Sequence, residues 1–227
     1  MNLNDQTVLL IILTLMSFAI AKMAYHRSKK NMLLQPLLMG VILVICGLYF
    51  FNIPYRQYLE CNAIFQWLLG PAVVSLAIPL YNNTHHVRQS LAVVLLTIIA
   101  SSSMVISITW MISQFFELQN HTQLALMTKS ATTPIALSIN EVLNGNQALA
   151  ATVVMFTGLI GAMVGPAILI RLGFHDHRTL GVALGLTSHA VGTQKALEIS
   201  PVCGAFAAFS MTLTGGVLAV VLPLIYR

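Results

Sequence analysis

Charged residues are scarce in this sequence. Of its 227 residues, 11 are Lys or Arg and 6 are Asp or Glu, so charged side chains make up 7% of the chain, against about 25% in a soluble globular domain. Such a chain lacks the polar surface that a water-facing shell needs, which excludes a soluble domain. A disordered chain is excluded as well, because disorder goes with low hydrophobicity and 57% of these residues are hydrophobic. The composition therefore predicts an integral membrane protein.

Cysteines and catalytic motifs are scarce too. The three cysteines, Cys46, Cys61 and Cys203, have neither CxxC nor metal-ligand spacing, so we interpret them as small apolar fillers. The sequence contains no Walker loop, nucleophile elbow or HExxH motif, and we expect no enzyme activity, no cofactor and no bound metal. The net charge of +5 comes from basic residues in separate short loops, which argues against a nucleic-acid partner.

Seven apolar runs are long enough to cross a bilayer, which takes about 20 mostly apolar residues. They are 7–25, 33–51, 63–81, 91–116, 148–172, 181–199 and 202–226. No polar connection is long enough to bury a core of its own, so we expect residues 1–227 to form a single integral membrane domain. The basic cluster of the first run follows it, so this run is expected to be a retained helix and not a cleaved signal peptide. The cluster comprises Lys22, Arg27, Lys29 and Lys30.

The stretch from Asn120 to Asn146 is apolar enough to enter the bilayer but is polar at its middle. If it crosses and the N-terminus is outside, the basic residues divide five inside against four outside; if it dips in and returns, they divide eight against one. In both cases Lys22, Arg27, Lys29, Lys30 and Arg88 are inside; Arg171, Arg178 and Arg227 join them only in the second, which leaves Arg56 outside. Because basic residues at span ends concentrate on the cytoplasmic side, the charges favour a re-entrant hairpin. The predicted fold is all-α, with about seven transmembrane helices plus this hairpin, with the N-terminus outside and the C-terminus cytoplasmic.

Two of the seven runs contain residues that weaken a helix. These are Gly70, Pro71 and Pro79 in the run 63–81, and Gly185, Ser188 and Gly192 in the run 181–199. Proline cannot donate a backbone hydrogen bond, and glycine relaxes the helix. In the predicted topology the two runs cross in opposite directions, and each is followed by one long apolar run. Broken helices in inverted repeats are typical of secondary transporters.

Polar segments inside two apolar stretches form the candidate binding site. Non-helical backbone is tolerated in a bilayer only when it is buried in protein or lines a watery cavity. Hydroxyls, freed amides, helix N-termini and a nearby lysine would direct donors at an anion there, so we predict a site for a small carboxylate without a metal. One half comprises Lys129, Ser130, Thr132, Thr133 and Pro134, and the other Ser188, His189, Gly192, Thr193 and Lys195.

The two lysines have two interpretations, one functional and one without a role in binding. A lysine at the bilayer centre costs about 2.5–3.5 kcal/mol, which favours a functional role for Lys129 and Lys195. Alternatively, both extend to the headgroups, which is easier for Lys195 because Glu198 is close. Thr132 and Thr133 are either ligands or partners of carbonyls that a following proline frees.

His189 has three interpretations. It is a proton carrier, a direct ligand of the substrate, or a neutral donor that holds the broken helix together. In the run 148–172, Gly158, Gly161 and Gly165 are small residues spaced for close helix contact. This spacing favours a packing role for them over a binding role.

Three segments resemble a known family. They are Gly70-Pro-Ala-Val-Val-Ser-Leu-Ala-Ile-Pro-Leu-Tyr81, Lys129-Ser-Ala-Thr-Thr-Pro-Ile-Ala136, and Gly181-Val-Ala-Leu-Gly-Leu-Thr-Ser-His-Ala-Val-Gly-Thr-Gln-Lys-Ala196, followed by Gly204-Ala-Phe. With these motifs in this order, the sequence resembles the LrgB/CidB family of multi-pass bacterial membrane proteins from the second run onward. The resemblance implies a location in the bacterial plasma (inner) membrane.

The resemblance implies two functions. Some members of the family are described as acting with a small, holin-like LrgA/CidA partner to modulate murein hydrolase activity and cell lysis. Others resemble pyruvate transporters and the plastidial glycolate/glycerate translocator. The broken-helix pattern favours transport of small organic monocarboxylates such as pyruvate, glycolate or glycerate, with regulation of murein hydrolases as the alternative. The expected partners are the LrgA/CidA-like protein, the carboxylate, the bilayer and a second copy of the chain.

Overall fold

The computed structural model describes residues 3–28, 34–75 and 77–226, and all regular elements in these ranges are helical. The all-α prediction is therefore confirmed for the described residues. Lys29, Lys30 and Arg227, which entered the charge count above, lie outside them. The chain divides into two compact units, Met1–Ser75 and Leu76–Arg227, which we call unit 1 and unit 2.

Unit 1 contains α1 (Leu3–Arg27), α2 (Pro36–Phe50), α3 (Tyr55–Cys61) and α4 (Ala63–Ser75). The axes of α2 and α3 are bent by 119°, and Asn52 in the turn between them has a positive φ of 51°. The bend brings α3 back to α1, where the Thr14 and Tyr58 hydroxyls are 3.0 Å apart. Large apolar side chains on α1 remain exposed, as in a helix that faces lipid.

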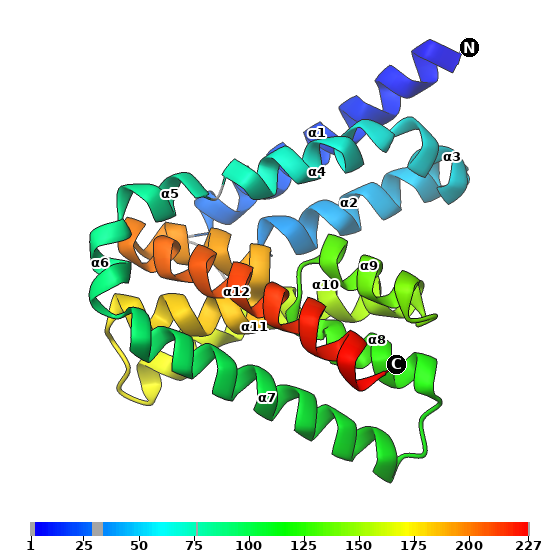
Figure 1. Cartoon of the computed structure of the whole chain (residues 1–227). Helices are drawn as coiled ribbons and strands as arrows, with labels where there is room; N and C mark the ends of the chain where they lie inside the picture. Colours follow the sequence, from blue (N-terminus) through cyan, green and yellow to red (C-terminus); the bar gives the residue numbers. More distant parts are fainter. Residues whose placement is uncertain (1–2, 29–33, 76, 227) are drawn as a thin grey trace. The chain divides into compact units, whose positions relative to one another are not determined.

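Unit 2 contains α5 (Ala77–Asn82), α6 (Thr84–Gln89), α7 (Leu91–Phe115), α8 (Asn120–Met127), the 3₁₀ helix η2 (Thr128–Ser130), α9 (Thr133–Val142), α10 (Gln147–Arg171), α11 (His177–Ile199) and α12 (Pro201–Ile225) (Figure 1). Within the described residues of the whole chain, four helices are long and apolar enough to cross a bilayer, α1, α7, α10 and α12, and the bent α2–α3 pair would make five. The expected count of seven is not confirmed. The run 63–81 is divided between α4 and α5, with Leu76 outside the described residues.

Residues 120–142, comprising α8, η2 and α9, turn back on themselves and are called hairpin 1. At its open end the backbone N–H of Asn146 donates to the His121 carbonyl over 3.2 Å. Between its arms, Asn140 Nδ2 donates to Thr128 Oγ1 over 3.0 Å. The chain thus leaves this stretch beside the point where it entered, which is the hairpin geometry predicted from the charge distribution.

Helix α11 also folds back, and here the prediction of a crossing over 181–199 is wrong. A straight helix of 23 residues would be about 34 Å long, yet Ser200 Oγ lies 2.9 Å from His177 Nδ1 at the opposite end of α11. The reversal occurs at His189, whose backbone is non-helical (φ 38°, ψ −124°). A Cβ on Gly192 would lie 2.6 Å from the Ser188 Cβ, across the turn. We call residues 177–199 hairpin 2; glycine and serine mark the site of a complete reversal and not of a kinked span.

The two hairpins pack at opposite ends of α10 and α12 (Figure 1). At the hairpin 1 end, a Cβ on Gly215 of α12 would lie 2.6 Å from Ile135. At the hairpin 2 end, a Cβ on Gly181 would lie 2.8 Å from the Phe206 Cβ. Hairpin 1 leads into α10 and hairpin 2 leads into α12, and these two helices run in opposite directions. The inverted pair is therefore hairpin 1–α10 and hairpin 2–α12, and not the runs 63–81 and 181–199 as expected.

Candidate functional site

The tips of the two hairpins meet partway along α10 and α12. The η2 segment contacts both α11 and α12, and α10 contacts every element of both hairpins. Four helix ends therefore come together inside unit 2: the C-terminal ends of η2 and of the first half of α11, and the N-terminal ends of α9 and of the second half of α11. Helix ends carry partial charges and unsatisfied backbone groups.

The tip of hairpin 1 is extended backbone followed by an uncapped helix. Ala131 has φ −86° and ψ 166°, and Thr132, the N-cap residue of α9, has φ −71° and ψ 154° but makes no side-chain capping bond. By contrast, α10, α11 and α12 are capped by the side chains of Asn146, Asp176 and Ser200, whereas α7 and α8, like α9, start without a side-chain cap. The first backbone amides of α9 thus have no side-chain cap, although Thr132 is only 5% exposed.

The tip of hairpin 2 depends on His189. A non-glycine residue with φ 38° and ψ −124° costs about 1–3 kcal/mol and persists only where its surroundings hold it. Here the ring nitrogen Nε2 lies 3.0 Å from the Val154 carbonyl of α10 and so donates a hydrogen bond to it. On the backbone side, Thr193 Oγ1 donates to the His189 carbonyl over 2.9 Å. This hydrogen bond is the contact expected if His189 is a donor that holds the broken helix.

The α10 glycines pack against this tip. A Cβ on Gly158 would lie 2.5 Å from His189 Cε1, and a Cβ on Gly161 would lie 3.3 Å from the Ser188 Cβ. A Cβ on Gly165 would be in ordinary contact with Leu184, at 3.6 Å. The close helix contact predicted for these glycines is therefore present, and two of them touch residues of the candidate site.

The structure separates the two candidate lysines. Lys129 is half-buried in η2, and its Nζ donates to Thr109 Oγ1 of α7. Among the described residues it has no acidic partner within ion-pair distance; the two ion pairs there are Arg56–Glu60 and Lys195–Glu198. Lys195 lies 2.9 Å from Glu198 and near the open end of hairpin 2, so its charge is compensated away from the tip.

The remaining candidates lie in or beside the tips. Ser130 is buried in hairpin 1, Thr133 is half-buried and Pro134 is exposed. Ser188 is fully buried, 3.2 Å from the Thr187 hydroxyl. Gly192 packs against the end of the first half of α11. No group of three or more His, Cys, Asp or Glu side chains that could hold a metal gathers within the described part of the chain.

Two hydroxyls that the sequence analysis missed, Ser102 in α7 and Thr214 in α12, are 2% and 0% exposed. Neither has a hydrogen-bond partner among the described residues. Leaving a buried hydroxyl unsatisfied costs about 1–3 kcal/mol. Their position at the midpoint of long apolar runs, 91–116 and 202–226, is the signal that could have identified them.

The chain matches the sequence model of a known protein family. The sequence model of the LrgB-like family matches residues 14–227. The holin-like protein CidB of Staphylococcus epidermidis is 28% identical over 225 residues, which cover 99% of this chain and 98% of that protein. CidB of Staphylococcus aureus is 28% identical over 226 residues, with the same two coverages of 99% and 98%. The uncharacterized protein YxaC of Bacillus subtilis is 32% identical over 206 residues, which cover 91% of this chain and 89% of that protein. No solved structure matches the chain.

Proposed function

The chain belongs to the LrgB-like family, and we propose that this membrane protein transports small organic monocarboxylates, of the size of pyruvate, glycolate or glycerate. The observation that carries the proposal is the meeting of two helix N-termini, those of α9 and of the second half of α11, at the hairpin tips. The N-terminus of a helix binds anions because its free N–H groups and the helix dipole favour negative charge. Broken helices that direct such ends at one site are typical of secondary transporters.

The charge at the tips fits a ligand with one negative charge. Lys129 is the tip's cation without an acidic partner among the described residues, whereas Lys195 is paired with Glu198. The half charges of the two N-terminal helix ends are offset by those of the two C-terminal ends that meet them, which leaves a net charge of about +1 from Lys129, enough for one carboxylate but not for two or three. Lys195 is therefore left out of the proposed site, which consists of both tips and Lys129.

The opposite directions of the hairpins provide two routes to one site. Hairpin 1 separates the tips from one end of unit 2, and hairpin 2 separates them from the other end. Opening one hairpin at a time would expose the same site to alternate sides of the membrane, as alternating access requires. In this mechanism His189 is a positioning residue, because it holds the tip of hairpin 2 on α10.

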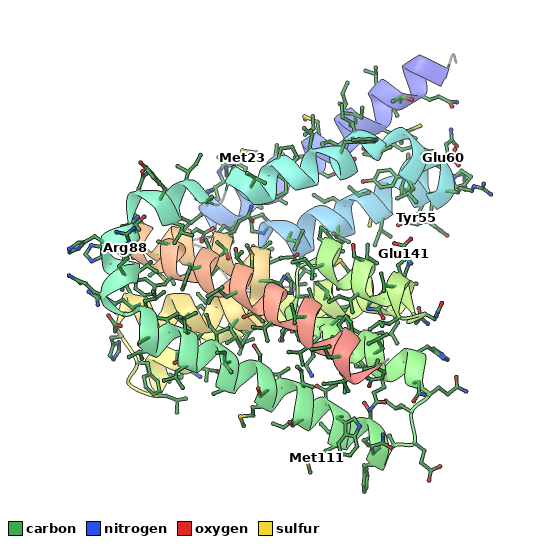
Figure 2. The ribbon with its side chains drawn as sticks, in the orientation of Figure 1. Met23, Tyr55, Glu60, Arg88, Met111 and Glu141 are labelled. Atoms are coloured by element: carbon green, nitrogen blue, oxygen red, sulfur yellow. The ribbon has the colours of Figure 1, made fainter. Side chains whose placement is uncertain are left out.

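The distribution of the described basic residues supports a cytoplasmic location for the hairpin 2 end. Arg88, Arg171 and Arg178 lie at that end, and none of the described Lys or Arg residues of unit 2 lies at the hairpin 1 end. Figure 2 shows Arg88 and Glu141 at these opposite ends. Since basic residues concentrate on the cytoplasmic side, hairpin 1 would open outward.

This orientation changes the side expected for the C-terminus. A cytoplasmic C-terminus depended on a crossing at 181–199, but hairpin 2 returns to its own side. Helix α12 ends near hairpin 1, where the Tyr226 hydroxyl lies 3.3 Å from Met127 Sδ, so we propose an external C-terminus. A reporter that is active only in the cytoplasm should be silent when fused after residue 227; activity there would contradict this orientation.

Transport is tested with purified protein in proteoliposomes. We expect uptake of labelled pyruvate or glycolate, and Lys129→Gln should lower it at least tenfold because it removes the compensating charge. The matched control is Lys195→Gln, which should leave uptake within about twofold because Lys195 is already paired. No substrate-dependent flux in the wild-type protein, with or without an LrgA/CidA-like partner, would contradict the proposal.

The second candidate function is regulation of murein hydrolase activity and cell lysis, because the CidB relatives are named holin-like proteins. The two candidates differ in what the tips should do. If lysis control is direct and independent of transport, Lys129→Gln should leave the lysis phenotype of a deletion strain fully complemented. If lysis follows from carboxylate flux, the same variant should fail to complement.

A further inference from the structure

The hydroxyls of Ser102 and Thr214 lie at the same level of two neighbouring helices. Helices α7 and α12 run in the same direction: Ile98 packs in a cluster with Phe206, and further along Ile106 packs in a cluster with Leu218. Ser102 lies midway between the two contacts on α7, and Thr214 lies between the same contacts on α12. Both are on the buried faces of their helices.

This level coincides with the hairpin tips. Three residues before Thr214, Met211 contacts Thr193 of hairpin 2, with 3.7 Å between Sδ and Oγ1. One residue after it, Gly215 packs against Ile135 of hairpin 1. Thr214 therefore lies beside the place where the uncapped start of α9 and the turn at His189 come together, and Ser102 lies at the same level on α7.

Neither hydroxyl makes the hydrogen bond to its own helix backbone that such a hydroxyl normally makes. A serine or threonine inside an apolar helix usually donates to the carbonyl four residues earlier, as Thr97 does to Val93 over 2.8 Å and Thr212 does to Ala208 over 2.9 Å. Ser102 and Thr214 make no such bond and have no other partner among the described residues, although both are almost completely buried. A buried polar group without a partner needs an explanation, and a bound ligand supplies one.

We propose that Ser102 and Thr214 bind the oxygen at C2 of the transported acid and so select 2-oxo and 2-hydroxy monocarboxylates over unsubstituted ones. This inference rests on the proposed transport function. With the carboxylate at the helix N-termini, the C2 oxygen is the next polar group along the ligand. A hydroxyl both donates and accepts, so the pair can donate to a ketone oxygen or accept from an alcohol.

Competition in proteoliposomes tests the inference. Unlabelled pyruvate, glycolate and acetate compete with labelled pyruvate for uptake by the wild-type protein and by the double variant Ser102→Ala/Thr214→Val. The wild type should prefer pyruvate and glycolate over acetate by about tenfold or more, because a site built to hydrogen-bond an oxygen rejects an analogue that lacks it. In the double variant we expect this preference to fall to about twofold or less, through weaker binding of pyruvate and glycolate and not of acetate.

Controls separate binding from folding. Ser103→Ala and Thr212→Val change exposed hydroxyls one and two positions away and should keep the wild-type preference. Thr214→Ser keeps the hydroxyl and should keep it too. The melting temperature of the double variant in detergent should be unchanged or higher, because the hydroxyls make no protein contact that stabilises the fold; a clear decrease would indicate a structural role and overturn the inference.

The outcomes distinguish the inference from the transport proposal. A wild-type preference that persists in the double variant, or a wild type that does not discriminate against acetate, overturns the inference and leaves transport standing. A wild-type protein that takes up none of the three acids overturns both.

Discussion

Hairpin 1 and hairpin 2 reach the same place by different means. Hairpin 1 reverses over a short 3₁₀ helix and two extended residues, and its arms are joined by Asn140 Nδ2 of α9, which donates to Thr128 Oγ1. Hairpin 2 reverses at a single residue, His189, in a backbone conformation that favours glycine, and its ring is held by α10. A side-chain bond therefore joins the arms of hairpin 1, whereas the ring at the tip of hairpin 2 is held by its neighbour α10.

The difference indicates which hairpin depends on its surroundings. If α10 moves by a fraction of an ångström near Gly158, the His189 ring loses its support, whereas the arms of hairpin 1 keep their bonds to each other. We therefore expect changes on α10 to affect hairpin 2 selectively. Three substitutions test this, from the largest expected effect to the smallest.

Gly158→Ala should break hairpin 2 most severely. The new Cβ would lie 2.5 Å from His189 Cε1 and 3.0 Å from its Nε2, and the ring cannot retreat without losing the Val154 bond. Overpacking of this kind costs about 1–3 kcal/mol, and uptake of labelled pyruvate should fall more than tenfold. The control is Gly216→Ala, where nothing lies within 4 Å of the added Cβ. Equal uptake by both variants would show that the tip is not held by α10.

Replacements of His189 separate backbone strain from side-chain support. His189→Gly and His189→Ala both remove the bond to Val154, but only glycine adopts φ 38° and ψ −124° at little cost. The glycine variant should therefore be the more stable of the two by about 1–2 kcal/mol, as measured by thermal unfolding in detergent. An alanine variant as stable as the glycine variant would argue against strain at this turn.

Ser200→Ala should have the smallest effect, at the open end of hairpin 2. Ser200 caps α12 by accepting from the Cys203 amide at 3.1 Å and also joins His177 at 2.9 Å. Loss of an N-cap costs about 1 kcal/mol. Asn146→Ala, which removes the cap of α10 at the hairpin 1 end, is the matched control. If Ser200→Ala loses more stability than Asn146→Ala, the difference measures the added contribution of the His177 contact. If it loses less, this contact does not hold hairpin 2 closed.

Long uninterrupted apolar runs predicted their helices closely. The runs 91–116 and 148–172 agree with α7 and α10 to within one residue at each end. The reversal in 120–146 was predicted from charge, because a hairpin there moves three arginines to the cytoplasmic side. That count needs the sequence alone. The reversal in 181–199 was missed because a hairpin of two short apolar arms has the same length and hydropathy as one crossing helix.

The polar residues of unit 2 also differ in how clearly the sequence alone singles them out. The sequence singled out the polar segment around Lys129 and the Ser188–His189 pair because their residue types are unusual in apolar surroundings. The sequence did not single out Ser102 and Thr214, because a single hydroxyl in an apolar helix is ordinarily satisfied by its own backbone. Only the side-chain conformations show that these two are not.

The sequence by itself determined that the protein is helical and apolar, because 7% charge and long apolar runs permit little else, and its motifs pointed to the LrgB/CidB family. The tertiary structure decided that there are two hairpins of opposite direction, that Lys129 and Lys195 are separated, and that His189 is held by α10. The physical reason is that hydropathy depends only on which residues are adjacent in the chain. The direction of a chain after a turn depends on one residue's backbone angles and on contacts with helices far away in sequence.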